Sequence, residues 1–330
     1  MRVHRPESSP VFLLGAGFSV DAGSEVGSLE TARYPLVSDL VKACFGLDEL
    51  PNGKSIEELF QGAIDAMDEA PLDKLYELIM EADYYLTRHL SPGGSRENNV
   101  YLRMLKDFQS APILTFNYDS LVEILLLKLG YWRPEDGYGM PVHTELISPP
   151  RNSATLHRGS LRPVLHLHGT LCVYPASVAL EREPNQRFDM LRPKEEPDFI
   201  FDPDRLGPCF MPFERVLPGP SFRHLPERVI APVPSKTDGL RGTFISRVHK
   251  RAVEIARSTR TIVAVGYSFN LYDRASYSHL LEAAGGARVI LVVPEAQALA
   301  SRLIVEYPEI AWYAVPATFK EWVTRGYEGL

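Results

Sequence analysis

Cysteine is scarce in this chain of 330 residues, which contains only Cys44, Cys172 and Cys209. No two of them have the short spacing that holds a structural zinc ion. An odd and sparse set of cysteines also does not form a disulfide framework. The histidines of the 157–168 stretch have no cysteine or carboxylate near them at ligand spacing. We therefore expect no metal site.

Basic residues do not outnumber acidic ones, with 35 Lys and Arg against 42 Asp and Glu. The formal net charge is −7 and the sequence pI is about 5.8, which argues against a large surface for binding phosphate backbones. No apolar run is long enough to span a bilayer, and the first ten residues lack the apolar core of a secretory signal. These absences predict a cytoplasmic protein that binds neither nucleic acid nor membrane directly.

The apolar content is sufficient for a full core, since 45% of the residues are hydrophobic. Near the C-terminus, buried strands alternate with amphipathic helices, which is typical of a doubly wound parallel sheet of the α/β class. The predicted strands are Thr261–Val265, Arg288–Val293 and Ile310–Val315, and the predicted helices are Phe244–Arg257, Ala275–Ala284 and Thr318–Val323.

Two insertions interrupt this Rossmann-like pattern. We expect one domain over residues 1–330, with a core of about 8–30, 110–130, 160–170 and 228–330. A helical insertion of about 30–109 contains a capping-box pattern that starts at Ser55. A second insertion, of about 131–235, contains 17 of the 27 prolines, so it favours loops and short edge strands.

The segment VFLLGAGFSVDAG, Val11–Gly23, begins as a buried strand and continues into a glycine turn. Such a turn lets backbone N–H groups face a phosphate at a helix N-terminus. The dehydrogenase pattern G-x-G-x-x-G fails at Val20, and Ser19 offers a hydroxyl that could reach a phosphate instead. A glycine turn alone is also common in proteins without a ligand there.

Two further strands are predicted to end in polar side chains. In Ala111–Asp119, Thr115, Asn117 and Asp119 alternate after an apolar start, and Val164–Thr170 leads to His168. The carboxyl ends of parallel strands meet at one edge of the sheet, where ligands bind. Ser19, Asn117 and His168 are therefore expected to line one crevice.

Four motifs occur in one order along the chain. They are G-A-G-x-S at Gly15–Ser19, T-x-N-x-D at Thr115–Asp119, H-G at His168–Gly169, and G-Y-S-x-x-x-x-D within Thr261–Asp273. Together they resemble the NAD-binding motifs of the sirtuin family, the last in a variant form. The cysteine pairs of sirtuin deacylases are missing, and VDAGSEVG replaces their Pro-Asp-Phe-Arg segment. The chain most resembles the bacterial sirtuin-like NAD hydrolases of anti-phage defence.

The resemblance implies cleavage of NAD+ to nicotinamide and ADP-ribose. Asn117 would orient the attacking water or the ribose hydroxyls, and His168 would act as general base. Asp119 would either contact the nicotinamide ribose or cap the helix that begins near Ser120, and both readings stay open. Asp273 is expected to be the N-cap of a helix that begins at Arg274.

The resemblance also assigns the cofactor contacts. The pyrophosphate would lie on Gly15, Ala16, Gly17 and Ser19, with Thr115 supporting the neighbouring strand end. Gly266 and Ser268 would approach the adenosine side. Glu295, just after a predicted strand, could accept a hydrogen bond from the adenosine ribose, by analogy with the acidic residue of dehydrogenases.

Three functions compete. NAD hydrolysis is favoured by Asn117 and His168 together, NAD-dependent deacylation is disfavoured by the missing cysteine pairs, and a module that only binds NAD or ADP-ribose is the third. An ordinary dehydrogenase ranks below these because the glycine pattern is incomplete. An ungated NAD hydrolase would starve its own cell, so the resemblance implies control by homo-oligomer assembly or by a partner such as a hexameric ATPase, a short Argonaute or a phage protein.

Overall fold

The structure is a computed structural model, and it describes residues 9–20, 22, 34–35, 37–51, 53–68, 70–89, 99–142, 160–170, 172–175, 199–201 and 244–330. Most of the proline-rich insertion, Cys209 and nearly all of the VDAGSEVG segment lie outside these residues.

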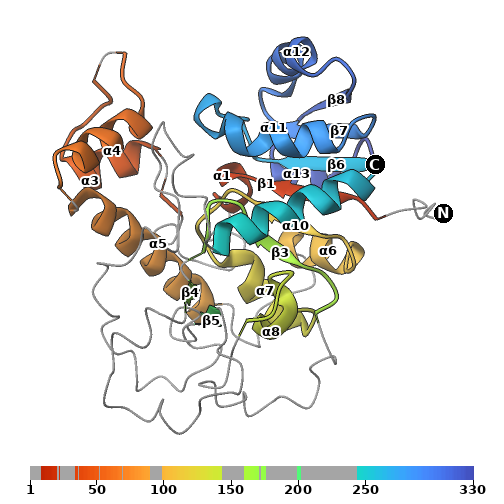
Figure 1. The fold of residues 1–330 in the computed structure, drawn as a ribbon, viewed down its shortest axis with the longest axis horizontal. Coiled ribbons are helices and arrows are strands. Elements are labelled where there is room, and N and C mark those ends of the chain that lie inside the picture. The colour runs from red at the N-terminus through yellow and green to blue at the C-terminus, as the bar shows by residue number, and fades with distance from the viewer. Residues whose placement is uncertain are drawn as a thin grey trace, which may run out of the picture.

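The core is a sheet of six parallel strands in the order β3-β2-β1-β6-β7-β8 (Figure 1). The chain begins in the middle at β1, builds outward to β3, then returns to the other side of β1 and builds outward to β8. This is the doubly wound order, so the predicted α/β Rossmann-like class is confirmed. The strands are β1 Val11–Leu14, β2 Ile113–Thr115, β3 Val164–His166, β6 Thr261–Val265, β7 Arg288–Val293 and β8 Ala311–Pro316.

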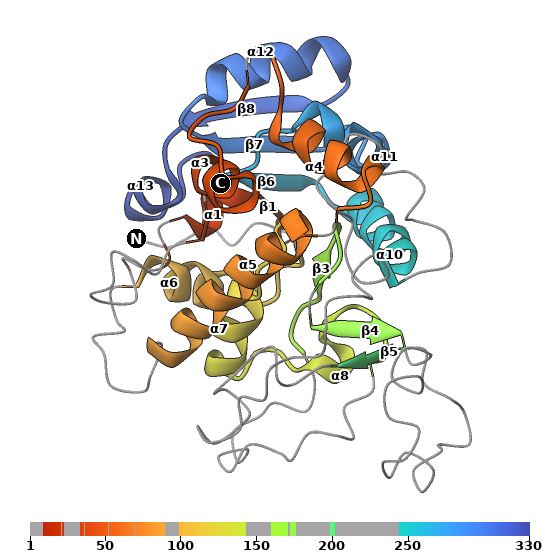
Figure 2. The ribbon, with the colours of Figure 1, turned by 90° about the vertical axis from the view of Figure 1, so that its left-hand side faces the viewer.

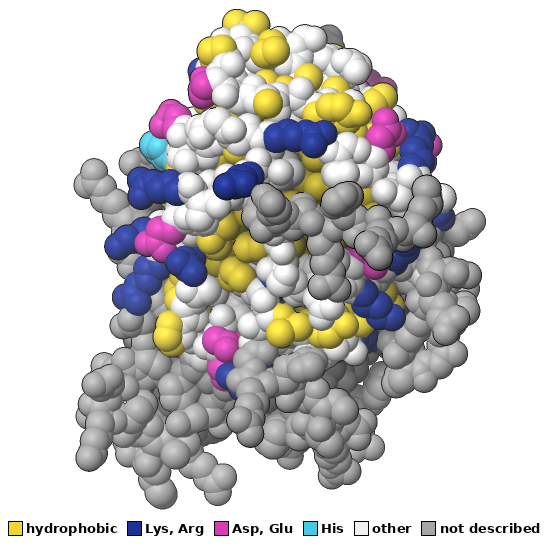
Figure 3. Space-filling view, turned by 90° about the vertical axis from the view of Figure 1, so that its right-hand side faces the viewer, with side chains coloured by type: hydrophobic (Ala, Val, Ile, Leu, Met, Phe, Trp, Pro, Cys, Tyr) yellow, Lys and Arg dark blue, Asp and Glu magenta, His cyan; other side chains and the backbone are white. Residues whose placement is uncertain are grey.

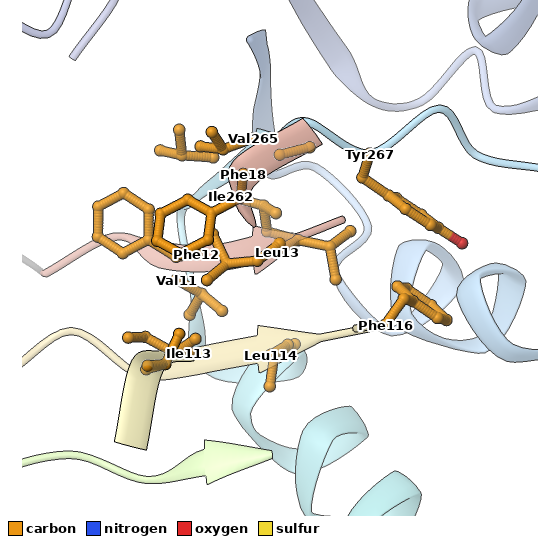
Figure 4. Packing of buried hydrophobic residues seen from close by; sticks show 14 of the residues in the cluster. Val11, Phe12, Leu13, Phe18, Ile113, Leu114, Phe116, Ile262, Val265 and Tyr267 are labelled. Atoms are coloured by element: carbon orange, nitrogen blue, oxygen red, sulfur yellow. The ribbon is translucent and has the colours of Figure 1, made fainter. Parts of the chain in front are cut away.

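The central strands are apolar because helices cover both faces of the sheet. All four residues of β1 are buried, and Phe12 is in register with Ile113 of β2 and Val263 of β6. Figure 4 shows these side chains packed together, with Phe116 and Tyr267 beyond the ends of β2 and β6. The prediction of β1, β6 and β7 is confirmed to the residue.

Strands β2 and β3 are shorter than predicted. β2 ends at Thr115, so Asn117 and Asp119 lie in the following loop, and β3 ends at His166, so His168 lies in a turn. The polar residues alternate with the period of a strand, but the backbone there is no longer paired with a neighbouring strand.

Helices divide between the two faces (Figure 2). On one face α6, α7 and α13 pack together, and on the other α10 packs on β3 and α11. Helix α12 packs on β7 and β8 at the edge. Their bounds are α6 Val100–Asp107, α7 Leu121–Leu129, α10 Phe244–Ser258, α11 Arg274–Ala283, α12 Ala296–Glu306 and α13 Phe319–Thr324, with the short turns α1 Ala16–Ser19, α8 Pro134–Gly137 and η7 Leu271–Asp273.

Three helices form a lobe with a small core of its own. They are α3 Val37–Phe45, α4 Ile56–Asp65 and α5 Ala70–His89, and their shared apolar cluster is Val41, Ile56, Phe60, Leu75, Tyr76 and Ile79. The capping box predicted at Ser55 is confirmed, since Ser55 and Glu58 bond reciprocally at the start of α4. Figure 1 places this lobe beyond the ends of the strands, on the side away from the N-terminus.

The described part of the proline-rich stretch contains a two-stranded antiparallel sheet, β4 Val173–Pro175 and β5 Phe199–Phe201. Short strands were predicted there because proline removes a backbone donor.

On the face drawn in Figure 3, basic side chains are interspersed with acidic and apolar ones. Among the helices that the structure describes, none combines the length and apolar character needed to cross a membrane.

Candidate functional site

Two glycine turns meet where the strand order reverses, one after β1 and one after β6. The N–H of Gly17 donates to the carbonyl oxygen of Gly266 at 3.0 Å. A Cβ on Gly15 would lie 2.6 Å from the Gly266 oxygen, and one on Gly17 would lie 2.9 Å from the Gly266 Cα. Gly266 itself has φ +61°, which favours glycine. The glycines therefore allow the two turns to touch. The Gly17 N–H, which was expected to face a phosphate, instead bonds to Gly266.

Asn117 joins the first glycine turn to the end of β2. Its side-chain Nδ2 donates to the Gly15 carbonyl oxygen and to the Ser19 hydroxyl, both at 3.0 Å. Its backbone N–H donates to the Thr115 hydroxyl at 3.0 Å, so Thr115 fixes the loop after the strand. The Asn117 side chain is buried with Ser19, and the expected approach of Ser19 to Asn117 is observed.

Asp119 lies just before α7. Its Oδ1 accepts a hydrogen bond from the backbone N–H of Leu121 at 3.2 Å, and the carboxyl group also bonds to Ser19. Burial raises the pKa of Asp119 to about 6, although both hydrogen bonds favour the ionised form. Asp119 thus bonds to the first residue of α7 from the position before the N-cap residue, Ser120, and its contact with a ribose stays a prediction.

Three further ionisable side chains near Asp119 are buried, those of His166, Glu123 and Asp83. His166 Nε2 lies 2.6 Å from the Glu123 Oε1 in an ion pair with both side chains essentially inaccessible. Burial lowers the pKa of His166, but the Glu123 carboxylate outweighs it, so the net direction is upward. Asp83 accepts from the Tyr34 hydroxyl and the Ser120 N–H, and burial raises its pKa well above the usual range.

His168 forms the second part of the site. It lies in the turn after β3, is only 4% exposed, and its Nε2 is 3.2 Å from the Asp273 Oδ1. The Phe116 ring packs edge-on against the imidazole with centroids 4.9 Å apart. Phe116 directly precedes Asn117, so this contact places His168 next to the loop that carries Asn117. Ser19 and Asn117 are in direct contact, and the expectation that they line one crevice with His168 stays a prediction.

The predicted N-cap position of Asp273 is confirmed, since α11 begins at Arg274. The side chain, however, makes no cap hydrogen bond. The carboxylate instead faces His168 and accepts from the Tyr267 hydroxyl. Sequence reasoning missed this pairing, although the spacing of tyrosine and aspartate in the G-Y-S-x-x-x-x-D segment was a signal that both could turn back toward one site.

The residues assigned to adenosine lie on the other half of the same sheet edge. Ser268 is exposed in the loop after β6, and its carbonyl oxygen accepts from Arg302 at 3.0 Å. Glu295 is exposed after β7 at the N-cap position of α12, with no side-chain cap hydrogen bond. Asn117 and His168 follow β2 and β3, so the two groups are separated along the edge.

The helical lobe covers this edge. The Asn270 side-chain amide donates to the Glu57 Oε1 of α4 at 2.6 Å, and Tyr118 packs against the apolar cluster of the lobe. The lobe thus contacts the loops that follow β2 and β6. Within the described ranges, no group of three or more metal-ligating side chains is brought together.

Comparison with known proteins gives only distant structural likenesses. No protein-family model matches the chain, and no curated protein matches it. A mutant Sir2 homologue in complex with ADP-ribose is 16% identical, with 96% of this chain and 88% of that chain covered and a TM-score of 0.42. Sir2Tm bound to a propionylated peptide is 13% identical, with 97% and 92% covered and a TM-score of 0.36. A Sir2 protein with a p53 peptide and NAD+ is 12% identical, with 96% and 90% covered and a TM-score of 0.34.

Proposed function

We propose that this protein is an NAD+ glycohydrolase that cleaves NAD+ to nicotinamide and ADP-ribose. The observation that supports this most is the convergence of a buried, carboxylate-paired His168 with the Asn117 network on the glycine turn after β1. A histidine and an amide at adjacent strand ends, beside the switch point of a doubly wound sheet, are suited to a nucleotide substrate with a labile glycosidic bond.

In the proposed reaction, water attacks C1′ of the nicotinamide ribose. The bond from C1′ to the nicotinamide nitrogen breaks, and nicotinamide leaves as a neutral molecule with the electron pair. Since the leaving group is already cationic, no strong acid is needed, and the transition state resembles an oxocarbenium ion. His168 takes the proton of the attacking water, and Asn117 orients the water or the ribose hydroxyls.

The binding roles follow the position of each residue. Gly15, Ala16, Gly17 and Ser19 would line the pyrophosphate, with Gly17 contributing close backbone approach because its N–H is bonded to Gly266. Asp119 would contact the nicotinamide ribose. Thr115 would support Asn117 through the hydrogen bond that its hydroxyl accepts from the Asn117 N–H. Gly266, Ser268 and Glu295 would line the adenosine side of the edge.

We also propose that the enzyme is an effector of anti-phage defence in the cytoplasm, acting by NAD+ depletion. Such an activity must be gated, either by self-assembly or by a partner of the hexameric ATPase, short Argonaute or phage-trigger kind. The isolated monomer would then turn over NAD+ weakly.

Chromatography of purified protein incubated with NAD+ tests the proposal. We expect nicotinamide and ADP-ribose in equal amounts, no requirement for an acetylated peptide, and no product with His168→Ala. The assay is repeated over a range of protein concentrations with light scattering, because assembly should raise the specific activity.

Two outcomes would favour the competing functions. Stoichiometric zinc by elemental analysis, with product only when an acylated peptide is present, would indicate a deacylase. Tight binding of NAD+ or ADP-ribose by calorimetry, without turnover at any assembly state, would indicate a regulatory subunit that senses these ligands.

A further inference from the structure

We propose that Asp273 and Tyr267 are positioning residues that stabilise the protonated form of the His168 imidazole. This inference rests on the proposed hydrolase function, in which His168 accepts a proton. Asp273 is 6% exposed and His168 is 4% exposed, so the 3.2 Å pair between Oδ1 and Nε2 is largely shielded from water. An ion pair of this kind is screened far less than one on the surface.

Tyr267 fixes the other oxygen of the same carboxylate. Its hydroxyl donates to the Asp273 Oδ2 at 3.2 Å. The Tyr267 ring is stacked on Phe116, with centroids 4.3 Å apart and planes 4° apart, as Figure 4 shows for the two labelled rings. Phe116 in turn packs edge-on against His168. The three rings and the carboxylate therefore contact one another in a closed set.

The backbone is shaped to bring Asp273 back toward β3. Gly266 and Phe269 both have positive φ, +61° and +50°, and the latter is unusual for a buried aromatic residue. The Arg302 guanidinium donates to the carbonyl oxygens of Ser268 and Phe269 at 3.0 and 2.6 Å, which holds this turn. A strained turn that is clamped in this way indicates that the position of Asp273 matters more than helix capping.

The charged and titratable groups around His168 are compatible with this role. His249 of α10 bonds to the Leu167 carbonyl oxygen at 2.7 Å, and burial lowers its pKa to about 4, so it is neutral near pH 7. Tyr118 packs against the imidazole from the β2–α7 loop, and its pKa is raised by burial. The carboxylate of Asp273 is thus the charge that stabilises the imidazolium.

The consequence for the reaction is specific. With the Asp273 Oδ1 3.2 Å from Nε2, a carboxylate lies beside the ring and favours the protonated imidazole. When water attacks C1′, its O–H bond breaks and the proton moves to the His168 imidazole, while the electron pair of the broken glycosidic bond leaves with nicotinamide. The resulting imidazolium is paired with the Asp273 carboxylate, in the manner of other histidine bases held by a carboxylate.

Asp273→Asn and Tyr267→Phe test this inference, with the exposed Asp65→Asn as a charge-matched control. Nitrogen-15 NMR of labelled histidine, with the His168 signal assigned by its loss in His168→Ala, reports the tautomer and the titration midpoint without any turnover. We expect the titration midpoint of His168 to fall by about one pH unit in Asp273→Asn. Tyr267→Phe should shift the midpoint less and in the same direction.

Kinetics provide the second measurement. Asp273→Asn should lower kcat by about two orders of magnitude or more, with the Kd for ADP-ribose within about threefold of wild type. Asp273→Glu should restore part of kcat, and Asp65→Asn should change neither quantity. If Asp273→Asn fails to fold, Tyr267→Phe carries the test, because its ring packing is unchanged.

The outcomes separate this inference from the proposed function. An unchanged His168 midpoint and kcat in both variants, in an enzyme that hydrolyses NAD+, would overturn the positioning role alone. A shifted midpoint in a wild-type protein that hydrolyses no NAD+ would support the pairing and overturn the hydrolase.

Discussion

The side-chain amide of Asn117 donates to the carbonyl oxygen of Gly15 at 3.0 Å, which ties the loop after β2 to the turn after β1. One residue thus belongs both to the proposed chemistry and to the framework. Its replacement should therefore affect rate and stability together, whereas replacement of a purely catalytic group should affect only the rate.

For Asn117→Ala we expect a loss of about 1–3 kcal/mol in the free energy of unfolding, because the Gly15 carbonyl and the Ser19 hydroxyl lose a buried donor. Nicotinamide release should fall by about two to four orders of magnitude. Urea unfolding and product chromatography measure the two effects. Asn117→Asp keeps the size and removes the amide donor, so it should lose at least as much stability as Asn117→Ala. A fully stable Asn117→Ala would contradict the network described here.

For His168→Ala we expect a similar loss of rate, about two to four orders of magnitude, since the general base is removed. His279→Ala is the control, because His279 is on the surface of α11 with its side chain 70% exposed. The measurement is the initial rate of nicotinamide release under identical assembly conditions. Equal rates for the two variants would remove His168 from the mechanism.

The sequence predicted the framework of the fold well. β1, β6 and β7 are continuous apolar runs bounded by turns, so their ends were clear from hydrophobicity alone. The ends of β2 and β3 were not, because Asn117 and His168 continue the strand period although their backbone has left the ladder. Local pattern does not reveal that a side chain bonds to a distant loop.

The candidate site was predicted in part for the same reason. Asn117 and His168 stood out as polar residues after apolar strands. The partner of His168 did not, because Asp273 directly precedes a helix, where aspartate is a common cap. The contact of Asp273 with His168 depends on the positive φ angles of Gly266 and Phe269 in the preceding turn. The buried pair of Glu123 and His166 was also missed, since Glu123 lies in an otherwise apolar helix.

Gly266→Ala should destabilise the fold through backbone contact. A Cβ at this position would lie 2.3 Å from the Phe18 backbone nitrogen, and the positive φ adds strain. We expect a loss of about 3 kcal/mol or more in the free energy of unfolding, from clash and strain together. Gly286→Ala is the matched control, because its φ is +80° and its Cβ would meet nothing within 4 Å of the described atoms.

Gly286→Ala should cost only about 1 kcal/mol, so the difference between the two variants isolates the contact between the glycine turns. Chemical denaturation under the same conditions gives both values. Equal losses would show that the turns after β1 and β6 do not touch as closely as described.

The Glu123–His166 pair should be a strong determinant of stability. Glu123→Ala leaves His166 buried without its carboxylate, for an expected loss of about 3–5 kcal/mol. Glu254→Ala breaks the exposed pair with Arg251 on α10 and should cost less than about 1 kcal/mol. Urea unfolding followed by circular dichroism compares them. A loss of under 1 kcal/mol for both variants would contradict the buried pairing.

Asp119 makes the stability of the fold depend on pH. Burial raises its pKa to about 6, above that of an unfolded chain, which is about 3.9. The folded protein therefore binds more protons than the unfolded one between these values. The stabilising contribution is complete below the unfolded pKa and is lost as the pH rises through the folded pKa. The pKa of Asp83 is raised as well, which adds in the same direction.

We expect the free energy of unfolding to be higher at pH 5 than at pH 8, by on the order of 1–2 kcal/mol. Asp119→Asn cannot ionise but keeps an oxygen that accepts from the Leu121 N–H, so its stability should vary less over this range and exceed that of wild type at pH 8. Asp65→Asn, on the exposed end of α4, should leave the wild-type pH dependence unchanged. Urea titrations at four pH values provide the comparison. Parallel curves for Asp119→Asn and wild type would mean that Asp119 is ionised in the folded protein throughout, and that its burial is fully offset by the hydrogen bonds it accepts.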